Sequence, residues 1–168
     1  IQGGAGTSLN MNANEVIANR AIELLGGNKG DYSIINPNDD VNCSQSTNDV
    51  IPTAGKMTSL RLLKNLKHEL LQLHGALCKK AEEFNDVIKM GRTQLQDAVP
   101  IRLGQEFRAY SVAIMRDIHR MEKAMGEMRT LNLGGTAVGT GLNADEAYLH
   151  RIVPILSEVS DMDLAQAY

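Results

Sequence analysis

The sequence has few aromatic residues and no tryptophan, since phenylalanine and tyrosine together make up only 4% of its 168 residues. Leucine and methionine, by contrast, recur at helical spacing. This combination weighs against a β-sandwich or barrel and favours helices packed on helices. We therefore expect an all-α fold.

Cysteine is also scarce. Cys43 and Cys78 lie far apart and near no CxxC or Cys/His cluster, which indicates neither a disulfide framework nor a zinc site. We expect two reduced thiols with buried structural roles. The histidines are scattered without metal-ligand spacing, and we predict no metal and no cofactor. They are His68, His74, His119 and His150.

Long apolar runs and basic clusters are missing as well. No segment approaches the roughly 18 apolar residues that span a bilayer, and no charged start followed by an apolar stretch suggests a signal peptide. The formal net charge is −3 and the sequence has no Lys/Arg cluster, so it does not indicate binding to nucleic acid or to an anionic membrane. We expect a cytoplasmic protein whose partner is a small molecule or another protein.

Periodic apolar residues predict four helices. The first covers about 12–25 and ends through a left-handed cap at Gly26 and Gly27. The second, near 30 residues long, follows a polar loop region at 31–53 and reaches Phe84. The third runs to Met128, and a shorter one covers about 145–157 around an awkward Pro154. Two long stripes mark the middle helices: Leu60, Leu63, Leu66, Leu70, Leu73 and Leu77, then Phe107, Ile114, Ile118, Met121, Met125 and Met128.

These two stripes need more partners than 168 residues supply, so we expect a helical bundle completed by further chain or further subunits. The chain begins at Ile1 without an initiator methionine and ends at Tyr168 soon after a helical segment. We interpret it as an internal fragment that self-associates.

Four polar, turn-forming segments alternate with the helices. They offer glycines, hydroxyls, side-chain amides and backbone N–H groups at helix starts, which together suit carboxylate binding without a metal. The segments are 4–12, 36–48, 91–100 and 134–143.

Simpler explanations exist for several of these residues. Ser46, Thr47 and Asn48 are preferred N-cap types, so capping the long helix is sufficient by itself. The glycines at 3–6 lack the Walker lysine and the GxGxxG register, which favours a tight turn. Asp97 can be a base, but an acid near a helix start more often interacts with the helix dipole.

Taken together, five strings in order resemble the aspartase and class II fumarase family over the entire chain. They are GAGTSLNMNANEV (4–16), NPNDDVN (36–42), SQSTND (44–49), KMGRTQLQDAVP (89–100) and GGTAVGTGLN (134–143). The resemblance implies a homotetramer around long central helices. It also implies that residues 1–44 end an N-terminal domain and that 45–168 begin the central bundle.

The resemblance also implies a set of substrate contacts for a small dicarboxylate, provided by hydroxyls and amides. These residues are Thr7, Ser46, Thr47, Asn48, Thr93 and Gln94, with Asn36, Asn38 and Asp39 as a second anion-binding loop. One serine or threonine can both cap and bind.

Two departures favour the ammonia-lyase branch of this family. Fumarases typically have histidine at the positions of Gln94 and Asn36. An amide cannot exchange a proton near neutral pH as imidazole does, so Gln94 is expected to act by hydrogen bonding. The implied reaction turns L-aspartate into fumarate and ammonia by anti-elimination through an aci-carboxylate.

The family's base resembles a serine on a GSSxMPxKxN loop, and no such string occurs before Tyr168. We therefore assign no catalytic residue to this chain, and we expect it to be inactive alone. Two alternatives stay open: a fumarate hydratase, and a non-catalytic helical assembly module that retains the loops for folding reasons.

Overall fold

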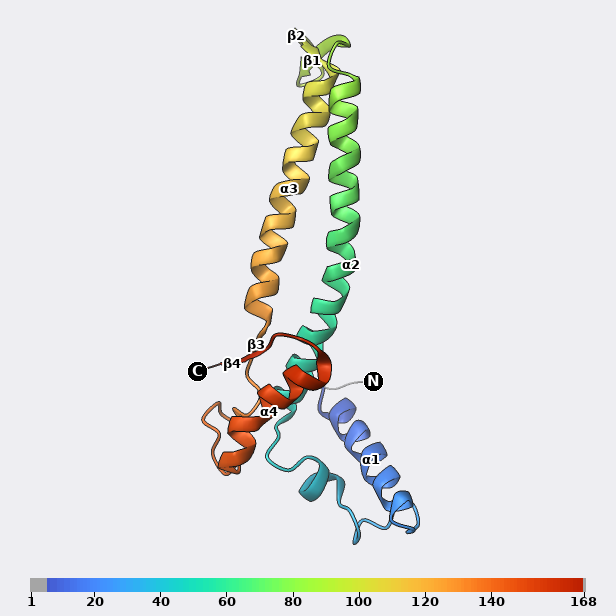
Figure 1. Cartoon of the computed structure of the whole chain (residues 1–168), viewed down its shortest axis with the longest axis vertical. Coiled ribbons are helices and arrows are strands. Elements are labelled where there is room, and N and C mark those ends of the chain that lie inside the picture. Colours follow the sequence, from blue (N-terminus) through green and yellow to red (C-terminus); the bar gives the residue numbers. More distant parts are fainter. Residues whose placement is uncertain (1–5, 168) are drawn as a thin grey trace. The chain divides into compact units, whose positions relative to one another are not determined.

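The computed structural model describes residues 6–167, whose ribbons are shown in Figure 1. The elements are α1 (Thr7–Leu24), the π-helical turn η1 (Pro37–Val41), α2 (Thr47–Glu83), β1 (Ile88–Thr93), β2 (Gln96–Arg102), α3 (Leu103–Met128), β3 (Thr130–Leu131), α4 (Glu146–Ser160) and β4 (Ala165–Gln166). Helices dominate, which confirms the all-α prediction. The chain divides into two compact units: residues up to Thr58 together with those from Met128 onward, and residues 59–127.

Helix α1 begins at Thr7, not near residue 12 as predicted. Its buried face consists of Asn10, Asn14, Ala18 and Ile22, one residue in every four. The first two are polar, so apolar periodicity alone placed the start too late. The left-handed end is confirmed, because Gly26 has a φ of 82° just beyond the helix. Residues 3–5 lie outside the described residues, and the turn expected there stays a prediction.

Helix α2 is 37 residues long and passes through Pro52. The prediction of polar loop up to Thr53 was therefore wrong at its end. A proline inside a helix cannot donate to the carbonyl four residues earlier, here that of Asn48. Nδ2 of Asn132 donates to this carbonyl at 2.7 Å instead. The side-chain amide replaces the missing helical hydrogen bond.

The segment between the two long helices is a β-hairpin, where the sequence predicted only a polar, turn-forming segment. β1 and β2 pair antiparallel, with Ile88 opposite Arg102 and Thr93 opposite Gln96. The two residues between them, Gln94 and Leu95, have φ values of 48° and 66°. Positive φ at both central residues is typical of a two-residue hairpin turn, although glycine or asparagine is the usual choice.

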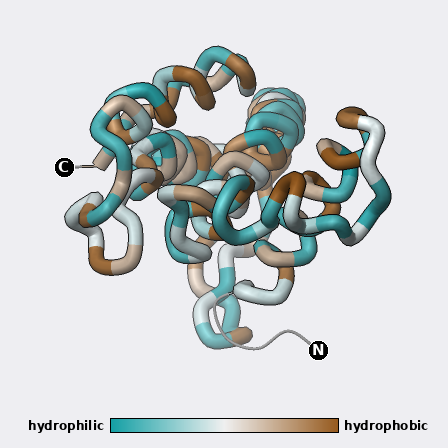
Figure 2. Tube along the Cα trace, turned by 90° about the horizontal axis from the view of Figure 1, so that it is seen from below, coloured by the Kyte–Doolittle hydropathy of each residue, from teal (hydrophilic) through white to brown (hydrophobic). Residues whose placement is uncertain are grey.

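In the second unit, α2 and α3 differ in how far their predicted apolar stripes are buried. Every member of the predicted α3 stripe from Phe107 to Met128 is at least partly buried, and Ile118 is 2% exposed. The α2 stripe is divided: Leu60 is buried, whereas Leu66 and Leu73 are 48% and 45% exposed. Figure 2 shows hydrophobic and hydrophilic stretches alternating along the helical coils.

In the first unit, α4 packs on a small apolar core of Leu131, Leu133 and Val153. The strands β3 and β4 pair in parallel beside it. Asp145 caps α4, and the helix continues through Pro154 to Ser160, beyond its predicted end. No helix within residues 6–167 has the length and apolar character of a membrane span.

Close approach of the two long helices depends on Gly104. A Cβ at this position would lie 2.3 Å from the carbonyl oxygen of Ala81 and 3.0 Å from Cα of Asn85. We predict that Gly104→Ala lowers the free energy of unfolding by about 1–3 kcal/mol, because backbone must shift to admit the methyl group.

Gly126 lies in the same helix, and a Cβ there meets nothing within 4 Å. Gly126→Ala is the matched control and should raise stability by roughly 0.5–1 kcal/mol through its helix propensity. Chemical denaturation of both variants measures the difference. Equal effects would show that the Gly104 contact does not limit packing.

Candidate functional site

Ser46 and Asp49 cap the start of α2 reciprocally. The N–H of Asn48 donates to Ser46 Oγ at 3.2 Å, and the N–H of Ser46 donates to Asp49 Oδ2 at 3.2 Å. This is a capping-box arrangement with aspartate in the acidic position. It confirms the capping interpretation of Ser46. The serine proton still remains available for donation to a ligand.

A network of side-chain amides leads to Thr47. Asn10 Nδ2 donates to Asn42 Oδ1 at 3.1 Å and lies 3.4 Å from Thr47 Oγ1. Asn14 Nδ2 donates to the same Asn42 oxygen at 2.9 Å, and Asn42 Nδ2 donates to the carbonyl of Gln45 at 3.1 Å. Asn10 and Asn14 are buried. The polar part of α1 therefore fixes the segment that enters α2.

The starts of α1 and α2 lie close together in the first unit (Figure 1), since Asn10 Nδ2 of α1 lies 3.4 Å from Thr47 Oγ1 at the start of α2. Gly6 has a φ of 90°, and a Cβ on it would lie 3.1 Å from the side chain of Ile51. Thr7 is exposed at the first position of α1, and Thr47 is partly buried at the first position of α2. Two helix N-termini thus place partial positive charge next to hydroxyl donors, which favours an anion.

Asp49 is buried behind the turn formed by Ser46, Thr47 and Asn48. Its side chain is 1% exposed, and its Oδ2 also accepts the N–H of Thr136 at 3.1 Å. Burial raises the pKa of this carboxyl, while the two backbone donors act in the opposite direction. None of the ion pairs within residues 6–167 involves Asp49.

The glycine-rich segment 134–143 forms a tight loop that contacts this turn through Thr136. The N–H groups of Gly139 and Gly141 donate to the carbonyl of Gly135 at 2.9 and 3.0 Å. Thr136 has a φ of 58°, a left-handed conformation that costs a non-glycine residue free energy. The loop is therefore held in a conformation that aims the Thr136 N–H at Asp49.

The predicted second anion-binding loop is a self-capped turn at η1. Asn36 Oδ1 accepts the N–H groups of Asn38 and Asp39 at 2.8 and 3.1 Å. The N–H of Asn36 in turn donates to Asp40 Oδ2 at 2.7 Å. The side chains of Asn38 and Asp39 are exposed, so anion binding at this turn stays a prediction.

Thr93 and Gln94 belong to the second unit, where both are exposed at the tip of the hairpin. Thr7, at the start of α1, and the turn formed by Ser46, Thr47 and Asn48 therefore belong to the first unit, whereas the hairpin residues belong to the second. The placement predicted for Asp97 was wrong: it lies on β2 rather than near a helix start, and its carboxylate pairs with Arg92 Nε at 3.0 Å.

The two cysteines are free, but Cys43 is exposed, so its predicted buried role was wrong. Cys78 is partly buried, with its Sγ 3.6 Å from His74 Nε2. His74 Nδ1 also lies 2.9 Å from the carbonyl oxygen of Ser111. No group of three metal-binding side chains occurs within the described part of the chain.

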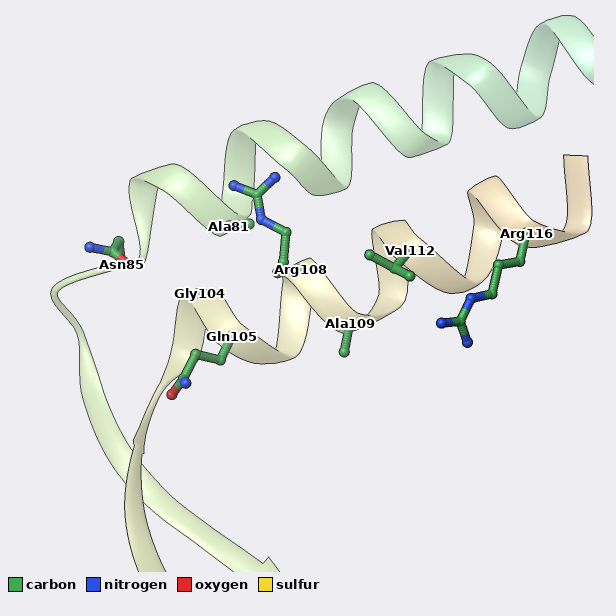
Figure 3. Close-up of a pocket in the computed structure, with 8 residues that line it drawn as sticks. All are labelled: Ala81, Asn85, Gly104, Gln105, Arg108, Ala109, Val112 and Arg116. Carbon is green, nitrogen blue, oxygen red and sulfur yellow. The ribbon is translucent and has the colours of Figure 1, made fainter. Parts of the chain in front are cut away.

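A hollow of about 580 Å³ lies along α2 and α3 in the second unit (Figure 3). It contains two arginines, but their side chains do not converge: Arg108 points toward α2, while Arg116 points away from it. Arg108 also lies 3.9 Å from Glu82. We therefore do not assign an anion site to this hollow.

Sequence reasoning missed the residues that support the turn. Asp49, Thr136 and Asn132 act from behind it, and their pairing joins positions more than 80 residues apart. Pro52 was the available signal, because a proline six residues into a helix leaves one carbonyl in need of a donor. The partner of that carbonyl was not predictable from spacing.

Known proteins resemble this chain along nearly all of its length. A family model described as Lyase matches residues 1–167. Aspartate ammonia-lyase of Bacillus subtilis (strain 168) is 56% identical over 167 residues, and that of Corynebacterium glutamicum is 51% identical over 166 residues. Each alignment covers 99% of this chain but 35% and 32% of those relatives, so the chain spans about a third of their length.

Two solved structures share the fold. A fumarate lyase:delta crystallin from Brucella melitensis superposes with a TM-score of 0.88 and 54% identity, covering 99% of this chain and 36% of that one. A class II fumarase from Schistosoma mansoni gives a TM-score of 0.82 and 38% identity, covering 94% and 33%.

The amide network makes Asn42 a sensitive position. We predict that Asn42→Ala lowers the free energy of unfolding by about 1–3 kcal/mol, because the buried amides of Asn10 and Asn14 lose their shared acceptor. Asn65, exposed on α2, is the control, and Asn65→Ala should change stability little or raise it slightly. Denaturant titration compares the two. Indistinguishable midpoints would contradict the network's role.

Tyr148 gives a prediction at high pH. Burial, with the nearby charges of Asp49 and Cys43, raises the pKa of its hydroxyl from 10.0 to about 12. The folded state then binds this proton more tightly than the unfolded state does, so the stability it contributes is complete below pH 10 and is lost as the pH rises toward 12.

Tyr148→Phe should remove one tyrosinate that titrates near pH 12 from the ultraviolet absorbance and flatten the loss of stability in that range. At neutral pH the variant should be as stable as the wild type or more so, because the hydroxyl is buried without a hydrogen-bond partner among residues 6–167. If the variant instead loses a tyrosinate that titrates near pH 10, the Tyr148 hydroxyl is open to water and the prediction is wrong.

Proposed function

The chain belongs to the lyase family that includes aspartases and class II fumarases, and from this premise we propose that the whole protein is an ammonia-lyase converting L-aspartate to fumarate and ammonia. The names of the relatives from Bacillus subtilis and Corynebacterium glutamicum support this substrate. The structural feature that carries the proposal is the turn formed by Ser46, Thr47 and Asn48 at the start of α2, close to the start of α1, whose first residue is Thr7.

This turn suits a carboxylate. The hydroxyl of Ser46 accepts a hydrogen bond from the Asn48 N–H and keeps its own proton for a ligand. Thr47 Oγ1 accepts a long hydrogen bond of 3.4 Å from Asn10 Nδ2. The N–H of Thr47 has no acceptor among residues 6–167. Hydroxyl and backbone donors at a helix N-terminus bind negative charge without a metal.

The proposed chemistry is an anti-elimination. A base removes a proton from Cβ of aspartate, and the electron pair moves into the adjacent carboxyl group to give an aci-carboxylate dianion. Collapse of the dianion forms the carbon–carbon double bond, while the C–N bond breaks and ammonia leaves with its electron pair. Donors arranged in advance around the developing charge lower this barrier. We assign the base to no residue of this chain.

Gln94 and Asn36 support aspartate over malate. Gln94 is exposed on the hairpin turn with its backbone held at positive φ, so its amide is presented for hydrogen bonding. A carboxamide does not act as an acid or base near neutral pH. Within this proposal, Gln94 and Thr93 complete the set of substrate contacts, and Asn36, Asn38 and Asp39 form a second place for an anion.

Fumarate hydratase is the second candidate, favoured by the structural similarity to the class II fumarase from Schistosoma mansoni. The two candidates share the carboxylate-binding turn and differ in the leaving group. Hydroxide leaves from malate and ammonia leaves from aspartate, so the choice of substrate separates them directly.

We propose further that the whole protein is a homotetramer. Support comes from the apolar side chains that α2 and α3 leave exposed, including Leu62 at 64% and Tyr110 at 56%. In the whole protein we place residues 1–44 in an N-terminal domain and 45–168 in a central helical domain. A cytoplasmic location stays a prediction from the sequence.

Initial rates of fumarate formation by the whole protein test the proposed activity. We expect fumarate from aspartate, and we expect Thr47→Val to lower kcat/KM about tenfold to a hundredfold, since a hydrogen bond to a charged group contributes about 1.5–3 kcal/mol. Thr58→Val is the matched control, because Thr58 is exposed farther along α2.

Fumarate formation from malate alone would replace the ammonia-lyase proposal by the hydratase. If the wild type is active and Thr47→Val has the same kcat/KM, the turn is not part of the substrate site. Loss of activity in both threonine variants would point to a general effect on α2 instead.

A further inference from the structure

One carboxylate oxygen joins two loops that are far apart in sequence, since Asp49 and Thr136 are separated by 87 positions. Asp49 Oδ2 accepts the N–H of Ser46 at 3.2 Å and the N–H of Thr136 at 3.1 Å. Ser46 begins the turn that leads into α2, and Thr136 lies in the glycine-rich loop. The position of each loop is therefore coupled to the other through a single side chain.

This arrangement exceeds what a helix cap requires. Asp145 at the start of α4 also accepts two backbone N–H groups, from Ala147 and Tyr148, yet it remains exposed. Asp49, in contrast, is 1% exposed, and one of its two donors comes from a distant segment. Burying a carboxylate is costly, so its presence here needs a role beyond capping.

A second contact fixes the other side of the same turn. Pro52 cannot donate to the carbonyl of Asn48, and Asn132 Nδ2 donates to it at 2.7 Å. Asn132 lies two residues before the glycine-rich loop, and its carbonyl accepts the N–H of Gly135 at 3.0 Å. The turn is thus held from both ends by the segment that carries Thr136.

The close packing of that segment makes it a rigid support. A Cβ on Gly135 would lie 3.1 Å from the carbonyl oxygen of Asn132 and 3.2 Å from Cα of Gly139. Thr136 adopts a left-handed backbone conformation next to this contact. Small shifts of the loop are therefore resisted by backbone atoms rather than by mobile side chains.

We propose that Asp49 is a positioning residue for carboxylate binding: it fixes the turn formed by Ser46, Thr47 and Asn48 against the loop at Thr136, so that the donors of the turn face the ligand without rearrangement. This inference rests on the proposed dicarboxylate site. Asp49 does not itself contact the ligand. Its acceptor atom matters, because the N–H groups of Ser46 and Thr136 must both be satisfied.

Two substitutions separate this role from others. Asp49→Ala removes the shared acceptor, and the turn should then lose its fixed position. Asp49→Asn keeps one carbonyl oxygen, which can accept both N–H groups but carries no charge. We expect Asp49→Ala to raise KM for aspartate and the dissociation constant for succinate by about tenfold or more, as small misplacements of binding groups do. Asp49→Asn should stay within about threefold of the wild type.

Asp145→Ala is the matched control, because it also removes the acceptor of two backbone N–H groups in the first unit. It should lower thermal stability while KM and succinate binding stay unchanged. All variants are made in the whole protein, and succinate binding is measured by calorimetry on the folded fraction. A smaller folded fraction alone lowers the apparent kcat in proportion to the amount of active protein. It leaves KM and the dissociation constant for succinate unaltered.

The inference is overturned if folded Asp49→Ala binds succinate within twofold of the wild type, or if Asp145→Ala weakens binding equally. It is also overturned if the wild type binds no succinate. Succinate binding that depends on Asp49, in a protein that forms no fumarate from aspartate, would uphold the positioning role and reject the proposed ammonia-lyase activity.

Discussion

The acceptance of two backbone N–H groups by Asp49 Oδ2 is the interaction on which the candidate site depends. It sets the start of α2 against the glycine-rich loop, and the amide of Asn132 secures the same turn at Asn48. The hydroxyls at the helix start are then free to act on a ligand because backbone groups behind them are already satisfied. Rigid support and ligand contact are divided between different residues.

This division explains why polar residues are buried in the first unit. Asn10, Asn14 and Asp49 occupy positions that face the interior, where apolar side chains would pack with less cost. Each is satisfied by hydrogen bonds to the segment around Asn42 or to the two loops. The first unit therefore has polar residues at interior positions, and their hydrogen bonds hold the start of α2 in one conformation.

The sequence predicted the elements with regular periodicity and missed those fixed by distant contacts. The α3 stripe from Phe107 to Met128 and the glycine end of α1 follow from local rules, and both are confirmed. The starts of α1 and α2 were misplaced, because Asn10 and Asn14 break the apolar pattern and Pro52 suggests a helix boundary.

For the site, the residue types of a carboxylate-binding turn were visible in the sequence, and the capping role of Ser46 followed from them. The support was not visible. In the sequence, Asp49 cannot be told apart from any other acidic residue in a first helical turn. Only its burial and its hydrogen bond from the Thr136 N–H distinguish it. Long-range pairing of this kind has no periodic signature.

A crystal structure of the whole protein with bound succinate tests the central claim most directly. The account predicts one succinate carboxylate within hydrogen-bond distance of Thr47 and of the hydroxyl of Ser46 or Thr7, with Asp49 still accepting from Ser46 and Thr136. Succinate bound away from this turn, or a turn that rearranges and releases Asp49 when the ligand binds, would contradict it.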